Sequence, residues 1–134
     1  MEYTKEALDH FQNPRNVGEI KDADGVGQVG NMKCGDVMQV SIKVGKRKSD
    51  QKDEEFIEDV KFKTLGCAAA IASSSMMTEL AKGKSLEDVE KLSRDDINEA
   101  LGILPKQKYH CSILSADAIH KAVEDFRSRK SNAK

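Results

Sequence analysis

Three cysteines lie in separate parts of this chain, and two further residues that can bind metal lie beside them. Cys34 is followed two positions later by Asp36, and Cys111 directly follows His110. The remaining cysteine, Cys67, comes directly after a glycine. Three thiolates with one carboxylate or imidazole form the four-ligand set that a tetrahedral zinc ion or a small iron–sulfur cluster requires. The sequence therefore predicts a metal or cluster site, provided that these distant segments converge.

Each of these residues also has a plainer interpretation. A single cysteine is most often a small buried hydrophobic residue, and an aspartate before a strand can cap a turn. The cysteines are 33 and 44 positions apart and include no Cys-x-x-Cys pair, so their spacing alone is only moderately specific. His10 and His120 are expected to have structural roles. The serine run 73–75 is expected on a helix surface, with no base to activate a hydroxyl.

Length, charge and composition exclude several classes of protein. At 134 residues the chain fits a single domain, residues 1–134, with a core of its own. Its net charge of −1 gives no electrostatic footprint for nucleic acid or an anionic membrane. The odd number of cysteines argues for reduced thiols and a cytoplasmic location. The N-terminus does not resemble a secretory signal, and no apolar run approaches the ~20 residues of a membrane span.

The expected elements place strands in the first half of the chain and helices in the second. Alternating apolar and polar residues predict strands over 37–44 and 57–65, joined by a charged, solvated loop at 45–55. Glycines predict turns around a short strand within 22–36. Helical periodicity predicts helices over 4–12 and 67–83. Capping signals predict two short helices after Ser85 and Ser93, the second of which ends at Gly102. A long amphipathic helix is expected from residue 112, with a flexible basic tail at about 128–134. This order argues for an α+β fold, with helices packed on one face of a small antiparallel sheet.

Every cysteine falls where one expected element meets the next. Cys34 lies in a glycine turn before a strand, whereas Cys67 and Cys111 open helices. At a helix N-terminus, unpaired N–H groups and the helix dipole stabilise a thiolate. Gly35 and Gly66 would let the backbone approach a metal closely. The site is therefore expected at element junctions.

A series of short segments spans nearly the whole chain in a distinctive order. The segments are DHFQNPRNVG (9–18), DGVG (24–27), CGD (34–36), KTLGC (63–67), AIASSS (70–75), HCSIL (110–114) and DAI (117–119). The series resembles the scaffold proteins of iron–sulfur cluster assembly, of the IscU type and the N-terminal domain of NifU. The fold implied is α+β, with a three-stranded antiparallel sheet of the SufE/IscU-like kind.

The resemblance implies an assembly scaffold rather than an enzyme: a [2Fe–2S] cluster is built on the protein and passed to apo-proteins. It implies Cys34, Cys67 and Cys111 as ligands, with Asp36 or His110 in the fourth place. Zinc is implied as an occupant when no cluster is present. Cys111 is also implied as the acceptor of persulfide sulfur. Because a carboxylate oxygen is a harder ligand than a thiolate, we expect Asp36 to be the labile ligand through which the cluster leaves.

The expected partners are a cysteine desulfurase, apo iron–sulfur proteins as acceptors and, as a further candidate, an iron donor. The family's chaperone-recognition stretch reads Leu104-Pro105-Lys106 here and lacks its second proline, which argues against dependence on a DnaK-class chaperone. Two alternatives use the same residues differently. A structural zinc domain would hold its metal permanently, and a zinc-binding sulfur-acceptor protein would bind zinc and accept persulfide sulfur. A sulfur carrier that acts only through a persulfide would not need Cys34 and Cys67.

Overall fold

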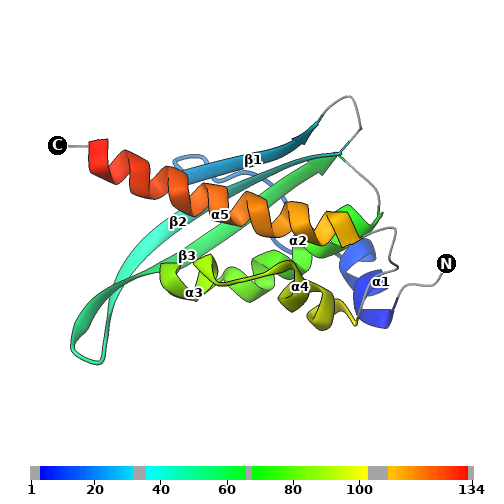
Figure 1. Cartoon of the computed structure of the whole chain (residues 1–134), viewed down its shortest axis with the longest axis horizontal. Helices are drawn as coiled ribbons and strands as arrows, with labels where there is room; N and C mark the ends of the chain where they lie inside the picture. The colour runs from blue at the N-terminus through cyan, green and yellow to red at the C-terminus, as the bar shows by residue number, and fades with distance from the viewer. Residues whose placement is uncertain (1–3, 32–35, 66–67, 103–108, 133–134) are drawn as a thin grey trace.

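The computed structural model describes residues 4–31, 36–65, 68–102 and 109–132, and these form an α+β fold. The elements, in chain order, are α1 (Lys5–Gln12), β1 (Gly25–Asn31), β2 (Asp36–Ser49), β3 (Lys52–Leu65), α2 (Ala68–Ala81), α3 (Leu86–Glu90), α4 (Arg94–Leu101) and α5 (Tyr109–Asn132). The three strands form one antiparallel sheet in the order β1-β2-β3, and α2 and α5 lie across one of its faces (Figure 1). The predicted fold class is confirmed. Within the described part of the chain, no helix combines the length and the apolar composition that a membrane span needs.

Strands β2 and β3 form a hairpin much longer than the sequence pattern predicted. The expected loop at 45–55 is wrong, because the ladder continues to Ser49 and Lys52 and only Asp50 and Gln51 form the turn. Both turn residues have positive φ, as a two-residue hairpin turn with the twist of its strands requires. The charged run pairs across the ladder with opposite signs, as in Arg47 opposite Glu54, whose side chains are 2.8 Å apart. Such cross-strand pairs stabilise a hairpin whose side chains remain largely in solvent.

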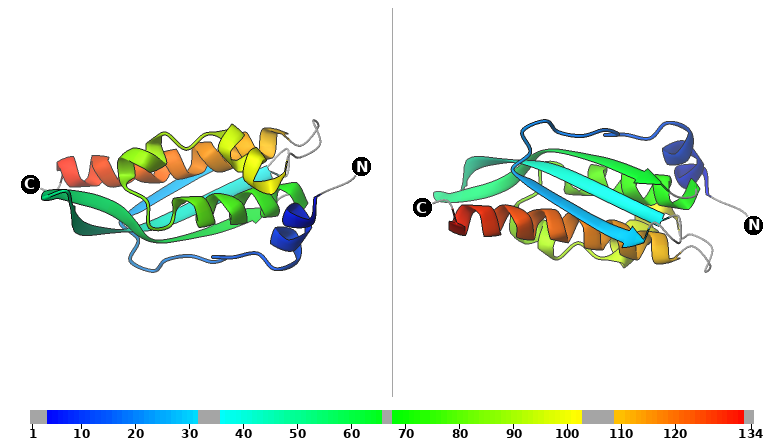
Figure 2. Two further views of the ribbon diagram at one scale, coloured as in Figure 1. Left: turned by 90° about the horizontal axis from the view of Figure 1, so that it is seen from below. Right: turned by 90° about the horizontal axis from the view of Figure 1, so that it is seen from above.

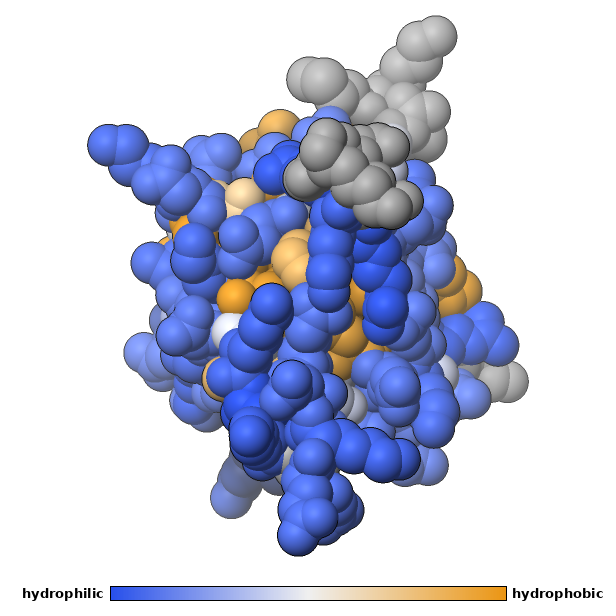
Figure 3. Space-filling view, turned by 90° about the vertical axis from the view of Figure 1, so that its left-hand side faces the viewer, coloured by the Kyte–Doolittle hydropathy of each residue, from blue (hydrophilic) through white to orange (hydrophobic). Residues whose placement is uncertain are grey.

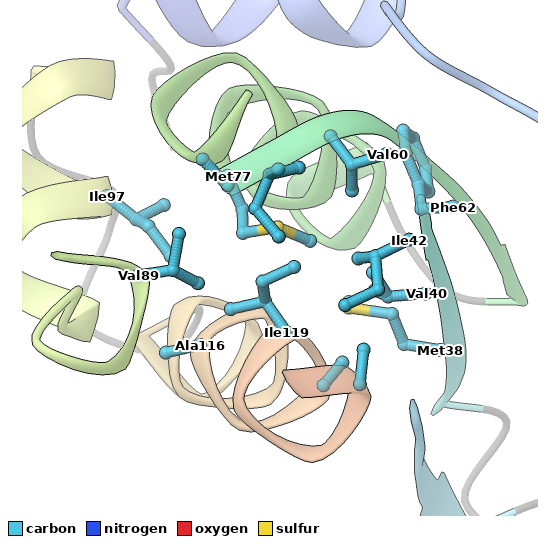
Figure 4. Close-up of a cluster of buried hydrophobic side chains, with 14 of the residues drawn as sticks. Met38, Val40, Ile42, Val60, Phe62, Met77, Val89, Ile97, Ala116 and Ile119 are labelled. Carbon is cyan, nitrogen blue, oxygen red and sulfur yellow. The ribbon is translucent and has the colours of Figure 1, made fainter. Parts of the chain in front are cut away.

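The core lies between the inner face of the sheet and the helices. Alternate residues of β2 and β3 point toward α2 and α5, as the period of a strand requires, and most are fully buried. The packed side chains, drawn in Figure 4, include Met38, Val40, Ile42, Val60 and Phe62 from the sheet and Met77, Val89, Ile97, Ala116 and Ile119 from the helices. The fully buried core is aliphatic apart from Phe62, consistent with an aromatic content of only 4%.

Helix α5 lies unusually close to the first strand. A Cβ atom added at Gly25 would lie 2.2 Å from the carbonyl oxygen of Ala122, and one added at Gly27 would lie 2.3 Å from that of Ala118. Only glycine permits this approach of a helix backbone to a strand backbone. The two views in Figure 2 show the sheet and α5 from opposite sides. Glycines that were predicted to form turns therefore also set the position of α5.

Local signals predicted most helix ends. Thr4 caps α1, Ser93 and Asp96 form a reciprocal capping box at α4, and Gly102 ends α4 in the left-handed conformation.

The last helix continues to Asn132, through most of the segment expected to be a tail. Its Lys130 ammonium lies 3.0 Å from the Glu55 carboxylate on β3. Figure 3, which faces the hairpin end, shows a mostly hydrophilic surface. The flexibility expected of residues 128–134 stays a prediction.

Candidate metal centre

The predicted ligands lie at the borders of the described segments. Cys34 and Cys67 fall outside the described residues. Asp36 is the first residue of β2, and His110 and Cys111 belong to the first turn of α5. For these last three, the structure gives the position of the backbone. The ligand set, and the choice between Asp36 and His110, therefore stay predictions, while the arrangement of the flanking elements can be described.

The sheet ladder brings two of the three cysteine-bearing segments together. Asn31 pairs with Asp36, so the segment that contains Cys34 begins and ends at neighbouring positions on β1 and β2. Val37 pairs with Leu65, two residues before Cys67. The start of β2 and the end of β3 are therefore adjacent, and α2 begins three residues after Leu65.

The third segment is joined to the second by a contact between helices. The Ser115 hydroxyl of α5 donates to the Ser73 hydroxyl of α2 across 3.0 Å. Ser115 is four residues after Cys111, which is about one helical turn. The beginning of α2, the beginning of α5, the end of β3 and the start of β2 all lie at the same end of the molecule (Figures 1 and 2). The fold therefore brings the described borders of all three segments to one corner, which we call the site corner.

A metal centre built only from described side chains is not found. In residues 4–31, 36–65, 68–102 and 109–132, no group of three or more His, Cys, Asp or Glu residues could hold a metal ion. Thiolates are the ligands that a soft metal or cluster prefers, and the three segments predicted to supply them have described borders at the site corner. Two helices also begin here, and their N-termini favour negative charge.

The serine run on α2 contradicts the prediction made from the sequence. Ser73, Ser74 and Ser75 are all fully buried, whereas a helix surface was expected. The reason is that α2 has neighbours on several sides: it packs against β3, α1, α4 and α5. Small hydroxyl side chains permit this close packing and find partners inside the protein. A sequence signal existed, because no charged residue occurs from Ala68 to Thr78.

Sequence reasoning also missed a polar joint between the N-terminal segment and α2. The Ser75 hydroxyl lies 2.7 Å from the His10 Nδ1 atom and accepts a hydrogen bond from the Arg15 backbone N–H at 2.9 Å. The Asn16 side-chain amide donates to the hydroxyl of Thr78, which lies about one turn after Ser75 on α2. This joint holds α1 and the segment after it against the helix that follows Cys67. The structural roles predicted for His10 and His120 agree with their contacts: His10 contacts Ser75, and the His120 Nε2 atom lies 3.1 Å from the Val89 carbonyl oxygen.

Charged neighbours and burial shift two pKa values at this joint. Burial lowers the pKa of the His10 imidazole below its usual value, and the Arg15 guanidinium lowers it further. Asp9 and Glu79 act in the opposite direction on His10, but their effect is smaller. The hydrogen bond from Arg15 lowers the pKa of the exposed Asp9 carboxyl. The lowered pKa favours the neutral form of His10, whose Nδ1 atom can accept a hydrogen bond from the Ser75 hydroxyl.

The outer face of the sheet is open at the site corner. The Leu65 side chain is 64% exposed, although it is large and apolar. It lies on the opposite face from the core, beside Val37 and close to Gln39 and Lys63, with which it lines a shallow surface pocket. A protein that approached the site corner from this side would meet the exposed Leu65 side chain rather than a helix.

Comparisons with known proteins agree with the sequence motifs. The family model described as "NifU-like N terminal domain" matches residues 2–133. The iron-sulfur cluster assembly scaffold protein IscU 1 of Archaeoglobus fulgidus is 60% identical over 124 residues, which cover 92% of this chain and 76% of the relative. The scaffold protein IscU of Escherichia coli is 48% identical over 133 residues, covering 97% and 98% of the two chains. The crystal structure of the N-terminal part of a NifU-like protein from Brucella abortus has the same fold, with a TM-score of 0.70 at 19% identity over 94% of each chain.

Proposed function

Because the chain belongs to the family of NifU-like N-terminal domains, we propose that it is a scaffold on which an iron–sulfur cluster is assembled and then transferred to apo-proteins. The observation that carries this conclusion is the match over residues 2–133, together with relatives that are named as assembly scaffolds and not as enzymes. The site corner supports it, because three distant cysteine-bearing segments have borders at one end of the fold.

The cluster proposed is a [2Fe–2S] cluster held by Cys34, Cys67 and Cys111. Asp36 supplies the fourth ligand, with His110 as the alternative. Two features support this assignment: Asp36 starts the strand that pairs with the end of β3, and His110 lies in the first turn of α5. Four thiolates would hold a cluster firmly, whereas a carboxylate oxygen binds cluster iron less well. Without cluster, the same thiolates suit zinc.

Asp36 has a specific role in this proposal. As the weakest ligand, it leaves one iron open to exchange with a thiolate of the acceptor protein. We expect Asp36→Ala to slow the loss of a preformed cluster to an apo-acceptor, measured as the decay of its visible absorbance after mixing. A cluster that left Asp36→Ala faster than it left the unchanged chain would contradict this role.

Sulfur reaches the site from a cysteine desulfurase. The Cys111 thiolate attacks the outer sulfur of the enzyme's persulfide, the donor S–S bond breaks, and the desulfurase cysteine leaves as a thiolate. A separate reductant supplies the two electrons that convert this sulfur to sulfide. The N-terminus of α5 favours the attacking thiolate. An iron donor and apo-proteins are the further partners, and independence from a DnaK-class chaperone rests on residues 104–106, which lie outside the described residues.

The test is anaerobic assembly on the purified chain with iron, cysteine and a desulfurase, followed by visible spectra and metal analysis. We expect a red-brown species that is lost in Cys34→Ala, Cys67→Ala and Cys111→Ala alike. His110→Ala tests the alternative fourth ligand, and His120→Ala is its matched control. His120 contacts the Val89 carbonyl oxygen, so its replacement should not affect the colour. A colourless protein that retains zinc and accepts persulfide sulfur would instead identify a zinc-binding sulfur acceptor.

A further inference from the structure

Three hydroxyl contacts beneath the site corner share one property. Each joins two of the three segments that carry the cysteines, and each lies within seven residues of a cysteine in the sequence. We call these contacts the hydroxyl ties. They are Thr64 to Val37, Ser74 to Met38, and Ser115 to Ser73.

Two ties fasten the β2 segment that follows Cys34 and Asp36. The Thr64 hydroxyl donates to the Val37 carbonyl oxygen across 2.7 Å, so the strand that leads to Cys67 is bonded to the residue after Asp36. The Ser74 hydroxyl lies 3.1 Å from the Met38 sulfur and donates to it. Ser74 and Met38 are both fully buried. The start of β2 is therefore held from β3 on one side and from α2 on another.

The third tie fastens α5 to α2. Ser115 and Ser73 are both fully buried, and their hydroxyl oxygens are 3.0 Å apart. Ser73 lies six residues after Cys67, and Ser115 lies one helical turn after Cys111. With this tie, the three cysteine-bearing segments are linked in series: β2 is tied to β3 and α2, and α2 is tied to α5.

Packing alone does not require hydroxyl groups at these positions. Neighbouring positions of α2, Ala70 and Ala72, are buried with no polar atom in the side chain. A hydroxyl adds a directional contact of fixed length, and a buried hydroxyl that lost its partner would cost stability. Metal ligands held by such supporting contacts keep their geometry, and a site without them becomes too loose for its metal.

We propose that the hydroxyls of the three ties are positioning residues, which set the separation of the cysteine-bearing segments to the size of a metal or cluster. This inference rests on the proposed function for its cargo, but it concerns the protein residues under the site and not the cysteines themselves. The remaining hydroxyls of the α2 run act elsewhere, since Ser75 and Thr78 bond to the N-terminal segment.

The test uses zinc alone as the probe and the complete chain. Thr64→Val, Ser74→Ala and Ser115→Ala each remove a hydroxyl with little change in volume. Zinc affinity is measured by competition with a chelator at a temperature where circular dichroism shows every apo-protein folded. We expect each variant to bind zinc roughly tenfold more weakly than the unchanged chain, at the low end of what outer contacts of a metal site contribute. Thr64→Ser keeps the hydroxyl and should restore the affinity.

The matched control is Ser41→Ala. Ser41 is buried on the same strand, but its hydroxyl accepts from the Ile20 backbone N–H, in a segment without cysteine. This variant should lower the free energy of unfolding and leave zinc affinity unchanged. If the tie variants lose no more affinity than Ser41→Ala, their role is general stability and the proposal is wrong. Absence of zinc binding by the unchanged chain would overturn it as well. Failure of cluster assembly with normal zinc binding would contradict only the proposed function.

Discussion

Gly27→Ala tests whether the close packing of α5 on β1 outweighs the stabilisation that replacing glycine by alanine normally gives. Gly27 is in β1, and its φ is not in the positive range that favours glycine. At such a position, alanine normally stabilises a protein by about 0.4–1 kcal/mol, because it restricts the unfolded chain. Here the added Cβ would lie 2.3 Å from the Ala118 carbonyl oxygen and 2.5 Å from the Ala122 backbone nitrogen. Both neighbours are backbone atoms and cannot rotate away.

The size of the effect follows from this distance. An ordinary contact of a Cβ atom begins at 3.4 Å, so α5 and β1 must separate by about 1 Å. Overpacking of this kind costs about 1–3 kcal/mol. For a chain of this length that corresponds to a fall in Tm of roughly 3–12 °C. The same shift should weaken zinc binding, because α5 carries Cys111 in its first turn.

Thermal unfolding followed by circular dichroism measures the first effect, and chelator competition measures the second. Gly83→Ala is the control: Gly83 has a φ of 84° and open space around its added Cβ. It should lower stability by about 1 kcal/mol through backbone strain and leave zinc affinity unchanged. A Gly27→Ala protein as stable as the unchanged chain, or more so, would refute the argument that backbone contact fixes α5.

Two further predictions concern pH and metal. Because burial and Arg15 lower the folded-state pKa of His10, the unfolded chain binds this proton more readily. The free energy of unfolding should therefore fall as the pH drops below about 6.5. Denaturant titrations at several pH values should show a smaller fall in His10→Gln than in the control His120→Gln. Zinc at 100 times its Kd should raise the free energy of unfolding by about 2.7 kcal/mol. Cys67→Ala should remove that gain, and a gain that persists would place the zinc elsewhere.

Elements with a repeated side-chain pattern were predictable from the sequence. Met38, Val40 and Ile42 alternate with polar residues, and this alternation indicated the buried face of β2. Helix ends were predictable where a single residue decides the geometry, as at Gly102, whose left-handed φ ends α4. These signals are local, so neighbouring residues are sufficient to recognise them.

The errors arose where structure depends on partners that are distant in sequence. Residues 45–55 show no apolar alternation, because both strands are largely exposed there and are stabilised by opposite charges across the ladder. Lys46 faces Glu55 and Lys48 faces Asp53 only in the observed register. The serines of α2 were expected in solvent because serine is polar. The absence of charged residues from Ala68 to Thr78 indicated burial, but it does not identify α1, α4, α5 and β3 as the elements that pack around the helix.

The candidate site shows the same division between local and distant information. Motifs predict which residues form the site, but cysteines 33 and 44 positions apart can share a metal only if the whole fold brings their segments together. The same dependence has a consequence for release. Metal ligands on separate elements couple metal binding to folding, so a bound cluster stabilises the fold. For the cluster to leave, its bond to at least one ligand must be weak. A site corner supported by hydroxyl ties but closed by one carboxylate would combine these needs: the supporting contacts keep the empty segments in place, and the exchange of a single ligand releases the cluster.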